Sequence, residues 1–195
     1  MYDPLRHWGF VDSKPKVVGI VSIGGLGVIG IKIAKALGHT VVAISQSDRK
    51  KDMALKVGAD HYVAMSDPKT QEGVPKCHII LNAVPATHQV ADYLCLLAKG
   101  GTIVQIGLVT TPHQVSQLPL MFNRQAIAGS LIGGIKSNEE VLELCAKHNI
   151  LPETETVLTD KIDWVYEKLN SGSNPDGVRY VIDIQKSIAA GFVPK

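Results

Sequence analysis

Residues 18–30 read Val-Gly-Ile-Val-Ser-Ile-Gly-Gly-Leu-Gly-Val-Ile-Gly, and this stretch decides the fold. A β-branched run meets a cluster of glycines, and residues 31–37 then favour a helix. The order strand, glycine turn and helix is the context in which a glycine pattern predicts a phosphate site. Glycine permits a sharp turn and lets pyrophosphate approach the helix N-terminus, where unpaired N–H groups and the helix dipole favour an anion.

The glycine spacing fits the dinucleotide-binding pattern in two frames. One frame, Ser22-x-Gly24-x-x-Gly27, has serine in the first glycine position. The other, Gly25-x-Gly27-x-x-Gly30, needs no substitution but lengthens the approach from the strand and pushes its last glycine into the helix. We prefer the first frame and expect Gly30 to lie where the helix meets the sheet. Because serine resists the left-handed backbone that glycine accepts, a purely structural strand-turn-helix stays open as the alternative.

The end of the next strand indicates which dinucleotide fits. Thr40–Ile44 is apolar and ends about 20 residues beyond the glycines, where this fold reads the ribose. An NAD site has an aspartate or glutamate at this position, which accepts from the ribose hydroxyls. This chain instead continues Ser-Gln-Ser-Asp-Arg-Lys-Lys over residues 45–51. Hydroxyls donate to a 2′-phosphate and cations neutralise it, which favours NADP. The alternative is a solvated first helical turn capped by Asp48. The residues expected to bind the 2′-phosphate are Ser45, Gln46 and Lys50, with Arg49 assisting.

Composition and charge exclude several classes of protein. The chain has 195 residues, 45% hydrophobic and 19% charged, which suits a cytoplasmic protein with one sizeable core and a small appendage. A net charge of +2 argues against a nucleic-acid or anionic-membrane partner. No apolar run reaches the roughly 18 residues of a membrane span, and the first residues do not form a signal peptide. The cysteines are far apart, and we expect three buried, reduced thiols: Cys77, Cys95 and Cys145.

Strand and helix patterns alternate through the rest of the chain. Six strands joined by helical crossovers predict an α/β fold with a doubly wound parallel six-stranded sheet, the Rossmann arrangement, over residues 1–150. Residues 151–195 break that rhythm and predict a short strand-helix-strand appendage, with a turn over residues 171–177. The expected later strands are His61–Val63, Cys77–Val84, Thr102–Ile106, Ala126–Ile132, Glu155–Thr159 and Val178–Ile184. The expected helices are Arg49–Val57, Thr87–Ala98, a helix capped by Ser137 that runs through His148, and Lys161–Asn170.

Several motifs together resemble the zinc-dependent medium-chain alcohol dehydrogenases, and in particular their NADP-dependent cinnamyl-alcohol-dehydrogenase branch. Gly100–Gly107 and Gly129–Gly133 resemble the two loops that hold the nicotinamide half of the cofactor in that family. Ser22 departs from the family's usual glycine. The resemblance covers nearly the whole chain, and it also rests on the glycine turn, Ile31–Gly38, Ser45–Lys50, Leu55–Val63, Tyr2–Leu5 and Val178–Asp183.

The resemblance implies hydride transfer between NADP(H) and a small alcohol or aldehyde. None of the residues it assigns to the cofactor is a general acid or a nucleophile, so we expect no catalytic residue within this chain. Gly107, Ser130 and Ile132 would flank the nicotinamide. The residues assigned to the pyrophosphate turn, largely through their backbone, are Ser22, Gly24, Gly25, Leu26 and Gly27.

The resemblance also implies what lies elsewhere. In the family an N-terminal domain supplies the catalytic zinc ligands and a four-cysteine structural zinc lobe, and this chain has no such cluster. Zinc is therefore expected only in an N-terminal domain absent here, and residues 151–195 are expected to be a remnant of that catalytic domain with a C-terminal tail. Family members pair through edge strands of two cofactor domains, which would place Ala126–Ile132 at the seam of a homodimer.

Two functions stay open at this point. One is the cofactor-binding portion of an NADP-dependent zinc alcohol dehydrogenase, and the other is a stand-alone NADPH-binding or sensing module without catalysis. A zinc-free quinone reductase is a lesser alternative, because the segment after Ser45 matches the zinc-dependent branch better.

Overall fold

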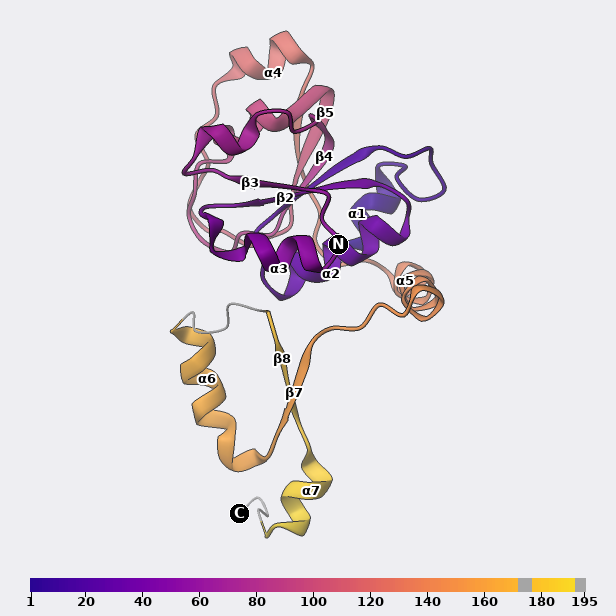
Figure 1. The fold of residues 1–195 in the computed structure, drawn as a ribbon, viewed down its shortest axis with the longest axis vertical. Coiled ribbons are helices and arrows are strands. Elements are labelled where there is room, and N and C mark those ends of the chain that lie inside the picture. The colour runs from indigo at the N-terminus through magenta and orange to yellow at the C-terminus, as the bar shows by residue number, and fades with distance from the viewer. Residues whose placement is uncertain (172–176, 192–195) are drawn as a thin grey trace.

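Six parallel strands form one sheet in the order β3-β2-β1-β4-β5-β6, which confirms the predicted fold class. The computed structural model describes residues 1–171 and 177–191 of the chain, and Figure 1 shows how its elements are arranged. The chain order reverses between β1 and β4, so this pair marks the topological switch point. The strands are β1 (Val17–Val21), β2 (Thr40–Ser45), β3 (His61–Ala64), β4 (Cys77–Asn82), β5 (Leu97–Gln105) and β6 (Ala126–Gly129).

Both faces of the sheet are covered, because its strands are apolar in continuous runs. One core cluster joins Ile20, Ile79 and Leu81 to the side of the sheet that carries α1, α2 and α5. The other joins Ile44 and Ile80 to the side that carries η3 and α4. The helices are α1 (Tyr2–His7), α2 (Gly25–Ala36), α3 (Lys51–Lys56), α4 (Gln117–Asn123) and α5 (Ile135–His148), and the 3-10 helices are η1 (Asp48–Lys50), η2 (Pro68–Gln71) and η3 (Val90–Leu96).

The register of the sheet aligns the carboxyl ends of its central strands. Val21 pairs with Ile44 on one side and with Asn82 on the other. Asn82 pairs with Gln105, and Gln105 pairs with Gly129. These residues therefore form one row at the edge where ligands bind in open α/β sheets.

The prediction of an α-helix over Thr87–Ala98 is wrong. The segment contains only the 3-10 helix η3, and Leu97 already belongs to β5, where it pairs with Cys77. The side-chain amide of Gln125 donates to the carbonyls of Leu94 and Leu97, each at 3.1 Å. Pairing with a neighbouring strand and a distant amide thus satisfies backbone groups that an α-helix would have satisfied internally.

Three smaller expectations also need correction. The sixth strand ends at Gly129 rather than at Ile132. The helix α5 begins at Ile135 after the N-cap Gly134, and the Ser137 hydroxyl donates to Asp3 at 2.7 Å instead of capping the helix. Of the three free cysteines only Cys77 is buried, whereas Cys95 is exposed and Cys145 is half-buried.

Beyond α5 the chain forms a small strand-helix-strand unit, as predicted. Its two parallel strands are β7 (Thr154–Val157) and β8 (Arg179–Ile182), and α6 (Ile162–Asn170) crosses between them after η4 (Thr159–Lys161). A further helix, α7 (Ile184–Ala189), follows β8. The turn predicted before β8 lies largely outside the described residues. Within the described ranges, no helix has both the length and the apolar character needed to cross a membrane.

Candidate cofactor-binding site

The turn between β1 and α2 has the backbone of a dinucleotide-binding loop in the Ser22 frame. Ser22 has a φ of 75°, the left-handed conformation that glycine ordinarily supplies. A Cβ atom at Gly27 would collide with the Ser22 carbonyl oxygen, so only glycine lets the helix approach the strand this closely. A Cβ atom at Gly30 would lie 3.4 Å from Ile20 Cδ1, which places Gly30 where the helix meets the sheet, as expected.

The N-terminus of α2 faces this turn without a side-chain cap. The first hydrogen bond of the helix joins the Val28 N–H to the Gly24 carbonyl at 2.9 Å. The N–H groups before Val28, at Gly25, Leu26 and Gly27, have no acceptor within the helix and carry the positive end of its dipole. These groups can bind an anion through the backbone alone.

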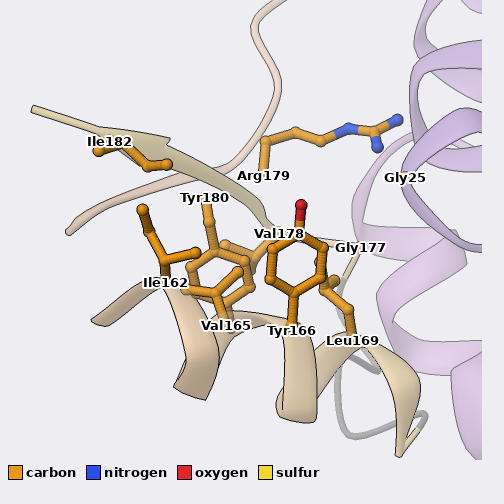
Figure 2. Close-up of a pocket in the computed structure, with 10 residues that line it drawn as sticks. All are labelled: Gly25, Ile162, Val165, Tyr166, Leu169, Gly177, Val178, Arg179, Tyr180 and Ile182. Atoms are coloured by element: carbon orange, nitrogen blue, oxygen red, sulfur yellow. The ribbon is translucent and has the colours of Figure 1, made fainter. Parts of the chain in front are cut away.

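Arg179, which the sequence analysis missed, lies against the same turn. A Cβ atom at Gly25 would lie 2.7 Å from Arg179 Cζ, and Figure 2 shows the side chain extending from β8 toward α2. A guanidinium group binds phosphate oxygens through a planar fork of N–H donors. The contact spans about 150 positions of sequence, so no local spacing could have revealed it; the only signal was an arginine in a segment with a family resemblance.

An apolar cavity lies beside this arginine. It has a volume of about 420 Å³. Side chains from α6 and β8 form its walls, and the glycine turn closes one end (Figure 2). The residues that line it are Gly25, Ile162, Val165, Tyr166, Leu169, Gly177, Val178, Arg179, Tyr180 and Ile182.

The segment after β2 lies next to the glycine turn. The Lys50 ammonium donates to the Ile23 carbonyl at 2.8 Å, which ties this segment to the loop after β1. Gln46 and Arg49 are exposed, and Ser45 is half-buried. Asp48 does not cap a helix: it begins η1, and the N-cap residue makes no side-chain hydrogen bond. The structure thus brings the residues expected at the 2′-phosphate beside those expected at the pyrophosphate.

Two of the three residues expected at the nicotinamide line one cavity of about 350 Å³ between the ends of β5 and β6. The Gly107 N–H donates to the Asn82 carbonyl at 3.0 Å, and the Ser130 N–H donates to the Gln105 carbonyl at 3.0 Å. A Cβ atom at Gly107 would collide with the backbone of residue 84, so glycine is required there. Ile132 does not line this cavity and is 84% exposed.

A polar network around the buried Asn82, also missed from sequence, supports these loops. The Asn82 side chain is fully buried, and its amide donates to Gln105 Oε1 at 2.8 Å and to His88 Nε2 at 2.7 Å. His88 Nδ1 lies 2.7 Å from the Ala86 carbonyl. Because Nε2 accepts from Asn82, Nδ1 must carry the ring proton and donate to that carbonyl. The network links the ends of β4 and β5, and the Gly107 loop is joined to it through the Asn82 carbonyl.

The described residues do not fit a metal ion. No group of three or more His, Cys, Asp and Glu side chains within residues 1–171 and 177–191 could hold one. Burial raises the pKa of the Cys77 thiol to about 12, so this side chain is not a thiolate at neutral pH.

Comparison with known proteins agrees with this geometry. The family model described as "Zinc-binding dehydrogenase" matches residues 25–147. The chain is 40% identical over 184 residues to the "Probable formaldehyde dehydrogenase AdhA" of Bacillus subtilis (strain 168), covering 94% of this chain and 52% of that protein. It is 39% identical over 183 residues to the "NADP-dependent alcohol dehydrogenase C 1" of Mycolicibacterium smegmatis, covering 93% and 51%.

A solved structure shows the same arrangement of elements. The crystal structure of CAD from Helicobacter pylori complexed with NADP(H) superposes with a TM-score of 0.79 at 35% identity, covering 95% of this chain and 52% of that one. The chain thus spans about half the length of the relatives it matches.

Proposed function

Because the chain belongs to the zinc-binding dehydrogenase family, we propose that it is the cofactor-binding portion of an NADP-dependent alcohol dehydrogenase, which interconverts alcohols and aldehydes by hydride transfer. The observation that carries this proposal is the convergence of three features at one edge of the sheet. They are the uncapped N-terminus of α2, the Arg179 guanidinium and the end of β2, where position 45 is a serine rather than an aspartate or glutamate. The names of relatives support it, since one is an NADP-dependent alcohol dehydrogenase and one was solved with NADP(H).

The residues present fit NADP(H). The diphosphate would lie between the first N–H groups of α2 and the Arg179 guanidinium, with Ser22, Gly24, Gly25, Leu26 and Gly27 forming the turn. The bound nicotinamide supplies the carbon that gives or accepts the hydride. This chain's own residues would bind and orient the cofactor, with Gly107 and Ser130 flanking the nicotinamide just beyond the ends of β5 and β6 and Ile132 flanking it from the exposed segment that follows β6.

Preference for NADP over NAD would come from the segment after β2. Ser45 and Gln46 can donate to a 2′-phosphate, and Arg49 and Lys50 would neutralise it. A hydrogen bond to a charged group contributes about 1.5–3 kcal/mol, which corresponds to roughly tenfold or more in affinity.

The organisation of the complete enzyme is part of the same proposal. Residues 1–150 would form the NADP-binding domain, and residues 151–195 the remnant of the catalytic domain with its C-terminal tail. Zinc would be bound in the N-terminal domain that supplies its ligands in this family, and the enzyme would act in the cytoplasm on small alcohols or aldehydes. The strand β6 forms one edge of the sheet, and a second copy pairing there would cover its unpaired backbone groups in a homodimer.

Calorimetric titration of the 195-residue chain with NADPH and with NADH tests the cofactor assignment. We expect NADPH to bind at least about tenfold more tightly, because only NADPH offers the 2′-phosphate to the segment after β2. Equal affinity for the two cofactors would contradict the assignment.

A further inference from the structure

Tyr62 holds the segment that follows β2 from the neighbouring strand. It lies in β3, which pairs in parallel with β2, and its side chain is only 7% exposed. The Tyr62 hydroxyl donates to the Ser47 carbonyl at 2.6 Å. The ring belongs to the core, while the hydroxyl reaches the segment proposed to bind the 2′-phosphate.

This bond adds to backbone hydrogen bonds that continue the pairing of β2 and β3 past the last residue of β3. The Met65 N–H donates to the Ser45 carbonyl at 2.8 Å, and the Ser66 N–H donates to the Gln46 carbonyl at 3.0 Å. The Tyr62 hydroxyl donates to the next carbonyl along the chain, that of Ser47. Three consecutive carbonyls are therefore held toward β3, and the last of them is held by a side chain.

The orientation of that carbonyl matters for an anion. A carbonyl oxygen carries partial negative charge, so one that turned toward a phosphate would repel it. The bond from Tyr62 keeps the Ser47 carbonyl directed at β3. Burial is the main cause that raises the pKa of Tyr62, although a hydrogen bond with the Ser45 side chain lowers it in part. Because the net shift is upward, the hydroxyl is protonated at neutral pH and can donate.

The other end of the segment is fixed as well. The Lys50 ammonium is bound to the Ile23 carbonyl, so the backbone between Ser47 and Lys50 runs between two anchored points. Without the Tyr62 bond, one of these anchors is lost, and the hydroxyls and cations of the segment must be ordered when phosphate binds.

We infer that Tyr62 is a positioning residue for cofactor specificity: by fixing the backbone at Ser47, it pre-organises the segment 45–50 for a 2′-phosphate and so selects NADPH over NADH. The inference rests on the proposed function. Tyr62 itself does not touch the phosphate; it acts through the segment that would.

The test compares Tyr62→Phe with a matched control, Tyr2→Phe, in the 195-residue chain. Tyr2 is also 7% exposed and also donates one hydrogen bond, to Glu140 at 3.1 Å, between α1 and α5 and away from β2. Calorimetry with NADPH and NADH gives the readout. We expect Tyr62→Phe to lower the affinity for NADPH about five- to tenfold and the affinity for NADH by less than about twofold. Tyr2→Phe should change neither affinity by more than about twofold.

The outcomes separate the two claims. Wild-type preference for NADPH combined with an equal loss of both cofactors in Tyr62→Phe, or with no loss, would overturn the role of Tyr62 and leave the proposed function standing. A wild-type chain without that preference would overturn the 2′-phosphate assignment, and the role of Tyr62 with it. Amide exchange gives a second readout: residues 47–50 should exchange faster in Tyr62→Phe only, and unchanged exchange would also count against the inference.

Discussion

Replacing Arg179 by methionine is expected to weaken the binding of NADPH and the binding of NADH to the same extent. The guanidinium lies against Gly25 at the glycine turn, where the diphosphate shared by both cofactors would bind. Methionine keeps an unbranched side chain of similar reach but cannot donate to phosphate or carry charge. The change therefore removes the charged contact and leaves the apolar cavity beside α6 largely intact.

The size of the effect follows from the exposure of the arginine. A hydrogen bond to a charged group contributes about 1.5–3 kcal/mol, or roughly ten- to 150-fold in affinity. Arg179 is exposed, and solvent screening weakens such contacts, so the lower part of that range applies. We expect a loss of about ten- to thirtyfold for each cofactor.

The assay is calorimetric titration of wild-type chain and variant with both cofactors, repeated at high salt. Arg124→Met serves as the control, because Arg124 is also an exposed arginine and follows α4, away from the glycine turn in the sequence. A loss confined to NADPH would assign Arg179 to the 2′-phosphate rather than the diphosphate. No loss at all would refute the reasoning that joins β8 to the glycine turn.

Four further predictions follow from the described residues. Ser45→Asp should reverse the cofactor preference in the same titration, because the carboxylate accepts from the ribose and repels a 2′-phosphate. Metal analysis of the purified chain should find no stoichiometric zinc, and the chain should not oxidise alcohols, since its described residues offer no cluster of ligands; zinc that a chelator removes together with activity would contradict this. Burial lowers the pKa of His39, whose Nδ1 accepts from the Lys16 N–H at 3.2 Å. The neutral imidazole therefore contributes its full stabilisation above the ordinary pKa of about 6.5, and this stabilisation is lost as the pH falls toward the lowered pKa. Urea unfolding at several pH values should show this loss, and His39→Gln should abolish it. Ile127→Lys in β6 should convert the proposed dimer to a monomer in sedimentation velocity, and a wild-type monomer would refute the dimer.

The strands could be predicted because central parallel strands are apolar over their whole length. Thr40–Ile44 was expected as a strand, and β2 extends it by one residue. The glycine turn was predictable for a similar reason, since its conformation depends on residues that are adjacent in the sequence. In both cases the information that determines the structure is local.

The errors and omissions arise where distant contacts decide the structure. The apolar spacing of Val90, Leu94 and Leu97 favours an α-helix, but Leu97 pairs with Cys77 and η3 results. The Arg179 contact could not be predicted because it depends on how the β7–β8 unit packs against the glycine turn, and the Asn82 network could not because it depends on which strands become neighbours. For Asn82 the register of β4 and β5 decides the contact, because it places Gln105 opposite Asn82.

Positive groups from distant parts of the chain lie beside the glycine turn. Cations near a helix N-terminus are locally unfavourable, because they face the positive end of the helix dipole. Yet the Lys50 ammonium lies on the Ile23 carbonyl just before α2, and the Arg179 guanidinium lies against its first residue, Gly25. Ser22 adds a left-handed backbone conformation that costs about 1–2 kcal/mol in a non-glycine residue. A diphosphate bound at this turn would offset the repulsion between these positive groups. An arrangement that destabilises the chain without a ligand is therefore accounted for by anion binding.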